Sequence, residues 1–190
     1  MNQPLLNTQV FDTFPQLESD RLVFEQYDQS HAADLLALRS DPLVMKYMDS
    51  PPFENIQTAV DRITENRLLF KEENGIVWVI KEKSSDDFVG DFSFWKIDKK
   101  NFRGEIGYAM LPRYWGKGYM TETMHTIFAF GFHQLGLHSI VADVNPDNEK
   151  SKSVLSKMGF QREAYFRESF YYDGQFLDSL IYCLLVSDFG

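Results

Sequence analysis

The stretch Gly104-Glu105-Ile106-Gly107-Tyr108-Ala109-Met110-Leu111-Pro112-Arg113-Tyr114-Trp115-Gly116-Lys117-Gly118 decides the fold of this chain. Its first eight residues have the pattern of a β-strand, and the apolar residues after Gly118 fall on one helical stripe that ends at Gly136. Such a strand-turn-helix junction is an anion site, because free amides at a helix start point outward and the helix dipole adds partial positive charge. Glycines at positions 116 and 118 remove side chains that would block a pyrophosphate.

Three alternatives compete for the residues of this turn. A P-loop needs four residues between its glycines and then Gly-Lys-Ser/Thr, whereas Lys117 is followed by Gly118 and the preceding glycine is Gly107. A dinucleotide fingerprint would place a third glycine where the chain has Thr121, and its first strand should not follow an antiparallel meander. A structural role, in which two glycines ease a tight turn without a ligand, remains open on the local pattern alone.

Outward from the junction, the pattern predicts a single α/β (α+β) domain at 17–190, preceded by a loose arm at 1–16. Ser30 is expected to cap the first helix, and the second is expected to begin at Thr58. The other expected elements are strands at 21–25, 76–81, 88–96, 103–111 and 138–144, helices after Gly118 and after the capping residue Asn148, and a closing hairpin of strands 160–171 and 176–185. Asp173-Gly174 is a strong hairpin-turn signal.

Composition limits the class of protein. The chain has 190 residues, of which 44% are hydrophobic and 25% charged, as expected for one soluble domain with a sizeable core. No apolar run approaches the roughly 20 residues of a membrane helix, and the amino terminus lacks a secretory signal, so we expect a cytoplasmic protein that does not contact membranes. A net charge of -9 argues against nucleic-acid binding and favours cationic partners such as amines.

Arg113-x-x-Gly116-x-Gly118 matches the Gln/Arg-x-x-Gly-x-Gly/Ala signature of GNAT acetyltransferases. The chain resembles the RimJ/RimL-like branch of that family at several further motifs, over about residues 17–186. These motifs are Leu17-Glu18-Ser19-Asp20-Arg21-Leu22, Gly104-Glu105-Ile106-Gly107-Tyr108, Tyr114-Trp115-Gly116-Lys117-Gly118-Tyr119, Asn148-x-x-Ser151, Lys157-Met158-Gly159-Phe160 and Gly174-x-x-x-Asp178. The resemblance implies a GNAT fold, with a mixed, mostly antiparallel twisted sheet splayed between its central strands and helices on both faces.

The resemblance also implies a site for acetyl-CoA as acetyl donor. Its pyrophosphate would lie at the glycine turn, which we define as Gly116-Lys117-Gly118, and its pantetheine would pair with the open strand edge. The thioester would lie beside Met110, whose backbone amide would donate to the oxyanion. The expected cofactor-binding residues are Ala109, Met110, Leu111, Arg113, Tyr114, Trp115, Gly116, Lys117, Gly118, Tyr119, Met120, Asn145 and Asn148.

Few side chains are needed for the chemistry. An alkyl amine is mostly protonated at neutral pH, so a base must take a proton before attack, and Glu105 is the candidate. Glu105 could instead fix a neighbouring backbone group or Arg side chain. Ser151 is carried over from the resembled branch as the group that protonates the CoA thiolate, with Tyr108 and Tyr165 as further candidates. Alternatively, Ser151 satisfies helix amides, Asn148 is simply the cap, and Asn145 only ends its strand.

The sequence therefore predicts an N-acetyltransferase that uses direct attack in a ternary complex on a protein N-terminal α-amine or a small cationic amine. The alternative is a non-catalytic acyl-CoA sensor. The single cysteine, Cys183, is expected to be a buried core residue, and the four histidines form no metal-ligand pattern, so no metal is predicted. Aromatic residues around the closing hairpin are expected to pack in the core, or else to line the acceptor pocket or a dimer surface; monomer and homodimer both remain open.

Overall fold

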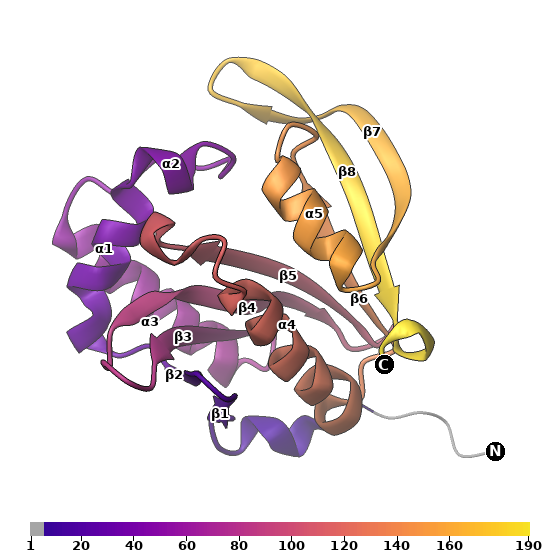
Figure 1. Cartoon of the computed structure of the whole chain (residues 1–190), viewed down its shortest axis with the longest axis horizontal. Helices are drawn as coiled ribbons and strands as arrows, with labels where there is room; N and C mark the ends of the chain where they lie inside the picture. Colours follow the sequence, from indigo (N-terminus) through magenta and orange to yellow (C-terminus); the bar gives the residue numbers. More distant parts are fainter. Residues whose placement is uncertain (1–5) are drawn as a thin grey trace.

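The computed structural model describes residues 6–190 and contains one eight-stranded sheet in the order β1-β2-β3-β4-β5-β6-β8-β7 (Figure 1). The strands are β1 (Leu17–Glu18), β2 (Leu22–Gln26), β3 (Ile76–Glu82), β4 (Phe88–Asp98), β5 (Arg103–Met110), β6 (Ser139–Val144), β7 (Gln161–Tyr172) and β8 (Gln175–Leu185). Every neighbouring pair is antiparallel except β5 and β6, which run parallel. The expected strands, the meander and the α/β fold class are confirmed.

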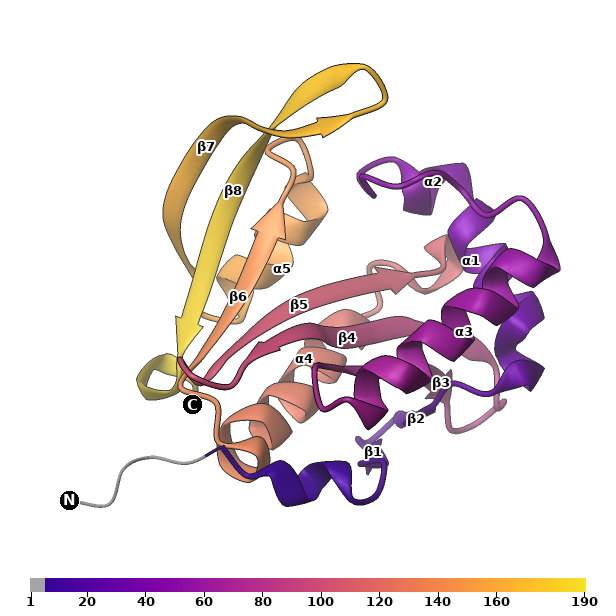
Figure 2. The ribbon, with the colours of Figure 1, turned by 180° about the vertical axis from the view of Figure 1, so that it is seen from behind.

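Helices cover both faces of this sheet, as expected. They are α1 (Ala32–Ser40), α2 (Pro42–Met45), α3 (Ile56–Lys71), α4 (Tyr119–Phe130) and α5 (Glu149–Lys157). Figures 1 and 2 show α4 and α5 on one face and α3 on the other, with α2 near the open end of the sheet. A π-helical turn, Gly131–Leu135, extends α4 to Gly136, whose φ of 84° is the left-handed stop that the sequence predicted.

The sheet splits between β5 and β6. The two strands pair only at Arg103 with Ser139, Gly104 with Ile140, and Glu105 with Val141. Beyond those pairs the strands diverge, and Figure 1 shows β6 leaving with α5 and the β7–β8 hairpin while β5 stays with α4. We call the divergence beyond Glu105 and Val141 the split. The predicted splay between the central strands is confirmed.

Two predicted helix starts were wrong. Asp28, not Ser30, begins the first helical segment, because its side chain accepts from Ser30 N–H at 2.8 Å and a 3₁₀ turn precedes α1. Asn55, not Thr58, begins the second, because its side chain accepts from Thr58 N–H at 3.1 Å. Asn148 caps α5 as predicted, and the Asp173-Gly174 turn takes the positive φ angles, 47° and 79°, expected of a tight hairpin.

The expectation of a loose arm is wrong for residues 6–16, and residues 1–5 lie outside the described part of the chain. A 3₁₀ turn covers Thr8–Phe11, and after it the Phe14 ring centroid lies 5.1 Å from that of Phe70 in α3 and 6.1 Å from that of Trp78 in β3. The indole N–H of the fully buried Trp78 donates to Pro15 O at 2.8 Å. A segment without sequence periodicity is thus held by aromatic packing and a buried hydrogen bond.

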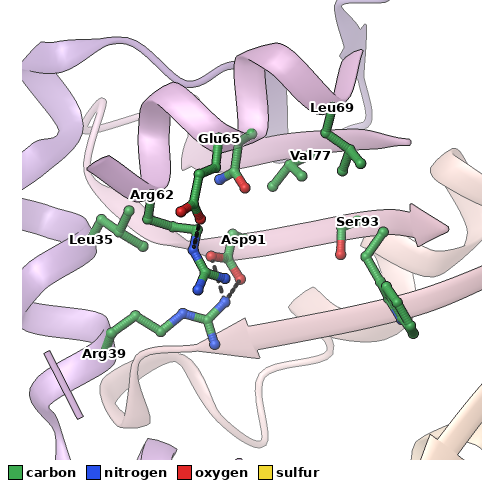
Figure 3. Close-up of a pocket in the computed structure, with 10 residues that line it drawn as sticks. Leu35, Arg39, Arg62, Glu65, Leu69, Val77, Asp91 and Ser93 are labelled. Atoms are coloured by element: carbon green, nitrogen blue, oxygen red, sulfur yellow. Dashed lines mark hydrogen bonds and ion pairs between the residues drawn. The ribbon is translucent and has the colours of Figure 1, made fainter. Parts of the chain in front are cut away.

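A buried ion pair ties α1 to β4. The Arg39 guanidinium contacts both oxygens of Asp91, at 2.9 and 3.0 Å, and the residue Asp91 is only 4% exposed (Figure 3). The Tyr27 hydroxyl also donates to Asp91, at 3.1 Å, and burial, followed by the Asp91 charge, raises the pKa of Tyr27 well above its ordinary value. The buried Asp91 carboxylate therefore depends on Arg39 and Tyr27 as its partners.

We expect Arg39→Met to destabilise the fold by about 3–5 kcal/mol, because it leaves the buried Asp91 charge unpaired. Urea unfolding measures the effect. Arg62→Met is the matched control: Arg62 pairs with Glu65 at 2.9 Å, but both side chains are more than half exposed, so its loss should cost under about 1 kcal/mol. Equal effects of the two substitutions would contradict the prediction.

Candidate active site

The glycine turn has the backbone conformation that makes glycine necessary. A 3₁₀ turn, Pro112–Tyr114, carries the chain from β5 to the turn, where φ is 73° at Gly116 and 80° at Gly118. No heavy atom lies within 4 Å of a Cβ built at Gly116, and the nearest to one built at Gly118 is Nη2 of Arg21, at 3.5 Å. The backbone is therefore left-handed and open to solvent at both positions.

Free backbone amides gather in this turn and at the start of α4. Tyr114 and Trp115 donate their N–H groups within the 3₁₀ turn, at 3.0 and 3.1 Å, and the first helical bond of α4 runs from Glu122 N–H to Gly118 O at 3.1 Å. Within residues 6–190, the amides of 116–121 donate to no protein acceptor. This is the arrangement that the anion-site hypothesis requires.

The aromatic side chains near the turn support its backbone. Tyr114 and Tyr119 are buried, 5.7 Å apart between ring centroids, and the Tyr119 hydroxyl donates to Glu82. Arg113 donates to Phe88 O at 3.3 Å, and Lys117 lies with Nζ 5.5 Å from the Tyr114 ring. Met120 is half-buried in the first turn of α4.

Trp115 occupies part of the open edge of β5. Its indole N–H donates to Met110 O at 2.7 Å, and Lys150 of α5 lies 3.7 Å over its ring. Leu111 N–H donates to Val89 O in β4, so strand alternation directs the N–H groups of Met110 and Tyr108 toward the split. The Met110 carbonyl is thus taken by the protein, whereas its amide, like that of Tyr108, faces the split.

Glu105 lies where the split begins. It is the last β5 residue paired with β6, it is half-buried, and within the described residues its carboxylate forms no ion pair or hydrogen bond. Burial raises the pKa of Glu105; Lys96 opposes that shift and the carboxylate of Asp143 adds to it. The alternative role, fixing a backbone group or an Arg side chain, therefore finds no support in the contacts.

Asp143 and Asp49 are carboxylates that the sequence pattern did not identify. Burial raises the pKa of both, and the Asp143 charge adds to the shift at Asp49. Both side chains are exposed by surface area, so water moderates the effect. Asp143 is a carboxylate within the otherwise apolar run of β6, which is the signal that could have identified it; Asp49 follows α2 and carried no such signal.

Tyr108 and Ser151 lie on the opposite face from Glu105. Tyr108 stacks on Phe92 at 5.8 Å, and Phe92 contacts Phe128 of α4, so strand alternation places Glu105 on the α3 face. The Tyr108 side chain is half-buried, but its hydroxyl oxygen is fully buried and has no hydrogen-bond partner within residues 6–190. Burial raises its pKa to about 12, and the nearby Ser151 hydroxyl opposes the shift without a hydrogen bond of good geometry.

The remaining candidates have structural roles. Asn148 accepts from Ser151 N–H at 3.1 Å as the α5 cap, and Asn145 accepts from Asp147 N–H at 2.9 Å at the end of β6. The Tyr165 hydroxyl donates to Asp178 on the exposed hairpin, so it is not the free hydroxyl expected of a proton donor. Cys183 is buried as predicted, and burial raises its pKa, which disfavours the thiolate.

A cavity of about 280 Å³ lies on the α3 face, between α1, α3 and strands β3 and β4. Arg39, Arg62, Asp91, Ser93 and Trp95 are among its lining residues, and Figure 3 shows the two guanidinium groups converging beside Asp91. A Cβ built at Gly107 would lie 3.3 Å from the Ser93 hydroxyl and 3.5 Å from Trp95. Two of the residues that line the cavity, Ser93 and Trp95, therefore lie next to Gly107 of β5.

A family model described as the acetyltransferase (GNAT) domain matches residues 21–161. The chain belongs to the GNAT acetyltransferase family. This GNAT chain is 34% identical over 172 residues to an uncharacterized N-acetyltransferase, YoaA, of Bacillus subtilis, covering 90% of this chain and 97% of the relative. It is 25% identical over 147 residues to a spermidine N(1)-acetyltransferase of Escherichia coli, covering 77% and 76%.

Among solved structures, RimL, a ribosomal L7/L12 alpha-N-protein acetyltransferase in complex with coenzyme A, matches with a TM-score of 0.84 at 20% identity, covering 92% of this chain and 99% of that one. The resemblance to the RimJ/RimL-like branch is confirmed, and the GNAT chain is an acetyl-CoA-dependent N-acetyltransferase. Within residues 6–190, no helix has the length and apolarity needed to cross a bilayer, and no group of three or more His, Cys, Asp or Glu side chains is arranged around a metal position.

We expect Gly116→Glu to weaken CoA binding more than 100-fold, because a carboxylate would stand where the free amides gather. Isothermal titration calorimetry measures the dissociation constant. Gly174→Glu is the matched control: its φ of 79° carries the same backbone strain, and its side chain would also meet open space, but it lies on the hairpin turn. Equal CoA affinity in the two variants would contradict the placement.

Proposed function

We propose that this GNAT chain acetylates a primary amine, either a protein N-terminal α-amine or a small cationic amine, by direct attack in a ternary complex. The observation that carries this proposal is the meeting, at one split in the sheet, of three features. These are the amides of 116–121 and the Glu105 carboxylate, which have no protein partner within residues 6–190, and the open backbone edge of β5.

The residues around the split fit acetyl-CoA, which supplies an acetyl group activated as a thioester. The amides of 116–121 would hold the pyrophosphate, and the Met110 amide would pair with the pantetheine as a neighbouring strand does. The Met110 carbonyl would not take part, because Trp115 already donates to it. The backbone thus supplies most of the binding.

Strand geometry limits where the acetyl group can lie. At ~3.3 Å per residue, Glu105 and Met110 are about 16 Å apart along β5, whereas Glu105 and Tyr108 are about 10 Å apart. A carboxylate that acts directly or through a water chain is better placed to serve an acetyl group near Tyr108. We therefore assign the oxyanion contact to the Tyr108 amide and leave the Met110 amide to the pantetheine.

Proton transfer divides between the two faces of the sheet. Glu105, on the α3 face, would accept the proton of the acceptor ammonium group, and its raised pKa makes it a stronger base than an exposed carboxylate. Tyr108 and Ser151, on the α4 face, lie beside each other without a hydrogen bond. We assign protonation of the leaving thiolate to this pair, with Tyr108 carrying the buried proton.

Charge and shape favour a cationic acceptor on the α3 face. The Asp143 charge raises the pKa of both Glu105 and Asp49, so these carboxylates, together with the net charge of -9, would attract a cation. The cavity lined by Ser93 and Trp95, whose side chains lie near Gly107, would take the rest of the acceptor. RimL is an alpha-N-protein acetyltransferase and the Escherichia coli relative is a spermidine acetyltransferase, so both proposed acceptor classes occur among similar proteins.

The acceptor class is tested by measuring CoA release from acetyl-CoA in the presence of polyamines, amino acids and N-terminal peptides. We expect turnover with cationic amines or peptides and none with their N-acetylated forms. An acyl-CoA sensor would bind CoA tightly and release no thiol with any amine, and that outcome would refute the transferase mechanism for this site.

We expect Glu105→Gln to lower kcat by about 100-fold or more while CoA affinity is unchanged, because general-base catalysis is lost. In the wild type, the acidic limb of kcat/KM should lie above the ordinary carboxyl pKa of 4.5, since burial raises the pKa of Glu105. Asp143→Asn removes a negative charge near Glu105, and this removal favours the ionised form of Glu105. The acidic limb of kcat/KM in that variant should therefore move to lower pH. An identical pH profile in wild type and Glu105→Gln would demote Glu105 to a structural role.

A further inference from the structure

The opening motif of the domain contacts the glycine turn, although Arg21 and Lys117 are 96 residues apart in sequence. Ser19 and Arg21 lie in the connection between β1 and β2, and Glu122 lies in the first turn of α4. The function proposed above leaves this connection without a role. It forms one hydrogen bond with the turn, from Arg21 to Lys117 O, and several with Glu122.

The Glu122 carboxylate is fully engaged by this connection. Its Oε1 accepts from the Ser19 hydroxyl at 2.7 Å and from Arg21 N–H at 2.8 Å, and its Oε2 accepts from Arg21 Nε at 2.7 Å and pairs with Nη2 at 2.7 Å. Burial alone would raise the pKa of Glu122, but these bonds outweigh it and lower the pKa. Glu122 is therefore ionised, and Arg21 neutralises it.

The other edge of the Arg21 guanidinium fixes the orientation of one peptide group in the turn. Nη1 donates to Lys117 O at 3.1 Å. Because a trans peptide is planar, its C=O and N–H point in opposite directions, so the Gly118 N–H points away from Arg21. The guanidinium itself is stacked 4.3 Å from the Tyr119 ring, whose hydroxyl is bonded to Glu82.

We propose that Arg21 and Glu122 are positioning residues that preorganise the glycine turn for the diphosphate of acetyl-CoA, an inference that rests on the cofactor site proposed above. Arg21 orients the Lys117–Gly118 peptide, and Glu122 holds Arg21 by two side-chain contacts. The pairing also cancels a carboxylate near the helix start, where an unpaired negative charge would repel the diphosphate. Ordering the amides before binding reduces the cost of binding.

Arg21→Met tests this role through the dissociation constants of two probes. Calorimetry measures CoA directly and measures pantetheine, which lacks the diphosphate, by competition. We expect the CoA constant to rise about 10-fold or more, because a charge-assisted contact is lost and Glu122 is unpaired. The pantetheine constant should stay at the wild-type value. Arg21→Lys keeps the charge but cannot bridge Glu122 and Lys117, so its CoA dissociation constant should lie between those of the wild type and Arg21→Met.

Lys83→Met is the matched control, because Lys83 is a neighbouring cation whose amine pairs with Glu18 and not with the turn. It should bind CoA as the wild type does. CoA affinity unchanged in Arg21→Met, or an equal loss for CoA and pantetheine, would overturn the positioning role. If Arg21→Met does not fold, the dissociation constants of CoA and pantetheine are measured for Arg21→Lys and Glu122→Gln instead.

The two proposals fail in different ways. If Gly116→Glu binds CoA like the wild type, the cofactor site itself is misplaced. If Gly116→Glu loses CoA while the Arg21 and Glu122 variants keep it, the cofactor site stands and only the positioning role is refuted.

Discussion

Backbone pairing between β5 and β6 ends at Glu105 and Val141, and the rest of the molecule is arranged around that interruption. A strand edge inside a sheet leaves N–H and C=O groups that need partners. In this chain the Trp115 indole takes the Met110 carbonyl, while the amides of Met110 and Tyr108 face the split. The helices and the hairpin that flank the split hold two halves of one sheet apart, so that a ligand can complete the pairing.

Both proposed halves of the reaction use the same strand. Alternation along β5 sends Glu105 and Gly107 to the α3 face and Tyr108 to the α4 face. The proposed base and acid would thereby lie on opposite sides of the reacting atoms. At Gly107, between them, the strand has no side chain, and the Ser93 and Trp95 side chains that line the cavity lie close to its backbone.

Much of this arrangement follows from local sequence. Glycines at 116 and 118, the helical stripe after them and the Asp173-Gly174 turn each act through backbone geometry within a few residues, and the structure agrees with the prediction at each. The helix starts at Asp28 and Asn55 were missed because several Asx and Ser/Thr residues competed as caps. Packing of residues 6–16 on Trp78 depends on aromatic contacts between distant segments, which no local period reports.

The site was predictable to the same degree. Its backbone part could be read from one strand and one turn, and Glu105 from its place on that strand. Asp143 and Asp49 could not be grouped with Glu105 because they come from β6 and from the segment after α2. Only in the folded chain does the Asp143 charge raise the pKa of the other two carboxylates. The contact of Arg21 with Glu122 and Lys117 was hidden for the same reason, since its motif predicted only a strand.

The buried Tyr108 hydroxyl has a consequence for the stability of the fold. A buried oxygen with no protein partner costs stability, about 1–3 kcal/mol, and a phenylalanine would pack against Phe92 without that penalty. A ligand that bonds to the Tyr108 hydroxyl would offset this cost, so occupation of the split and the stability of the fold are coupled.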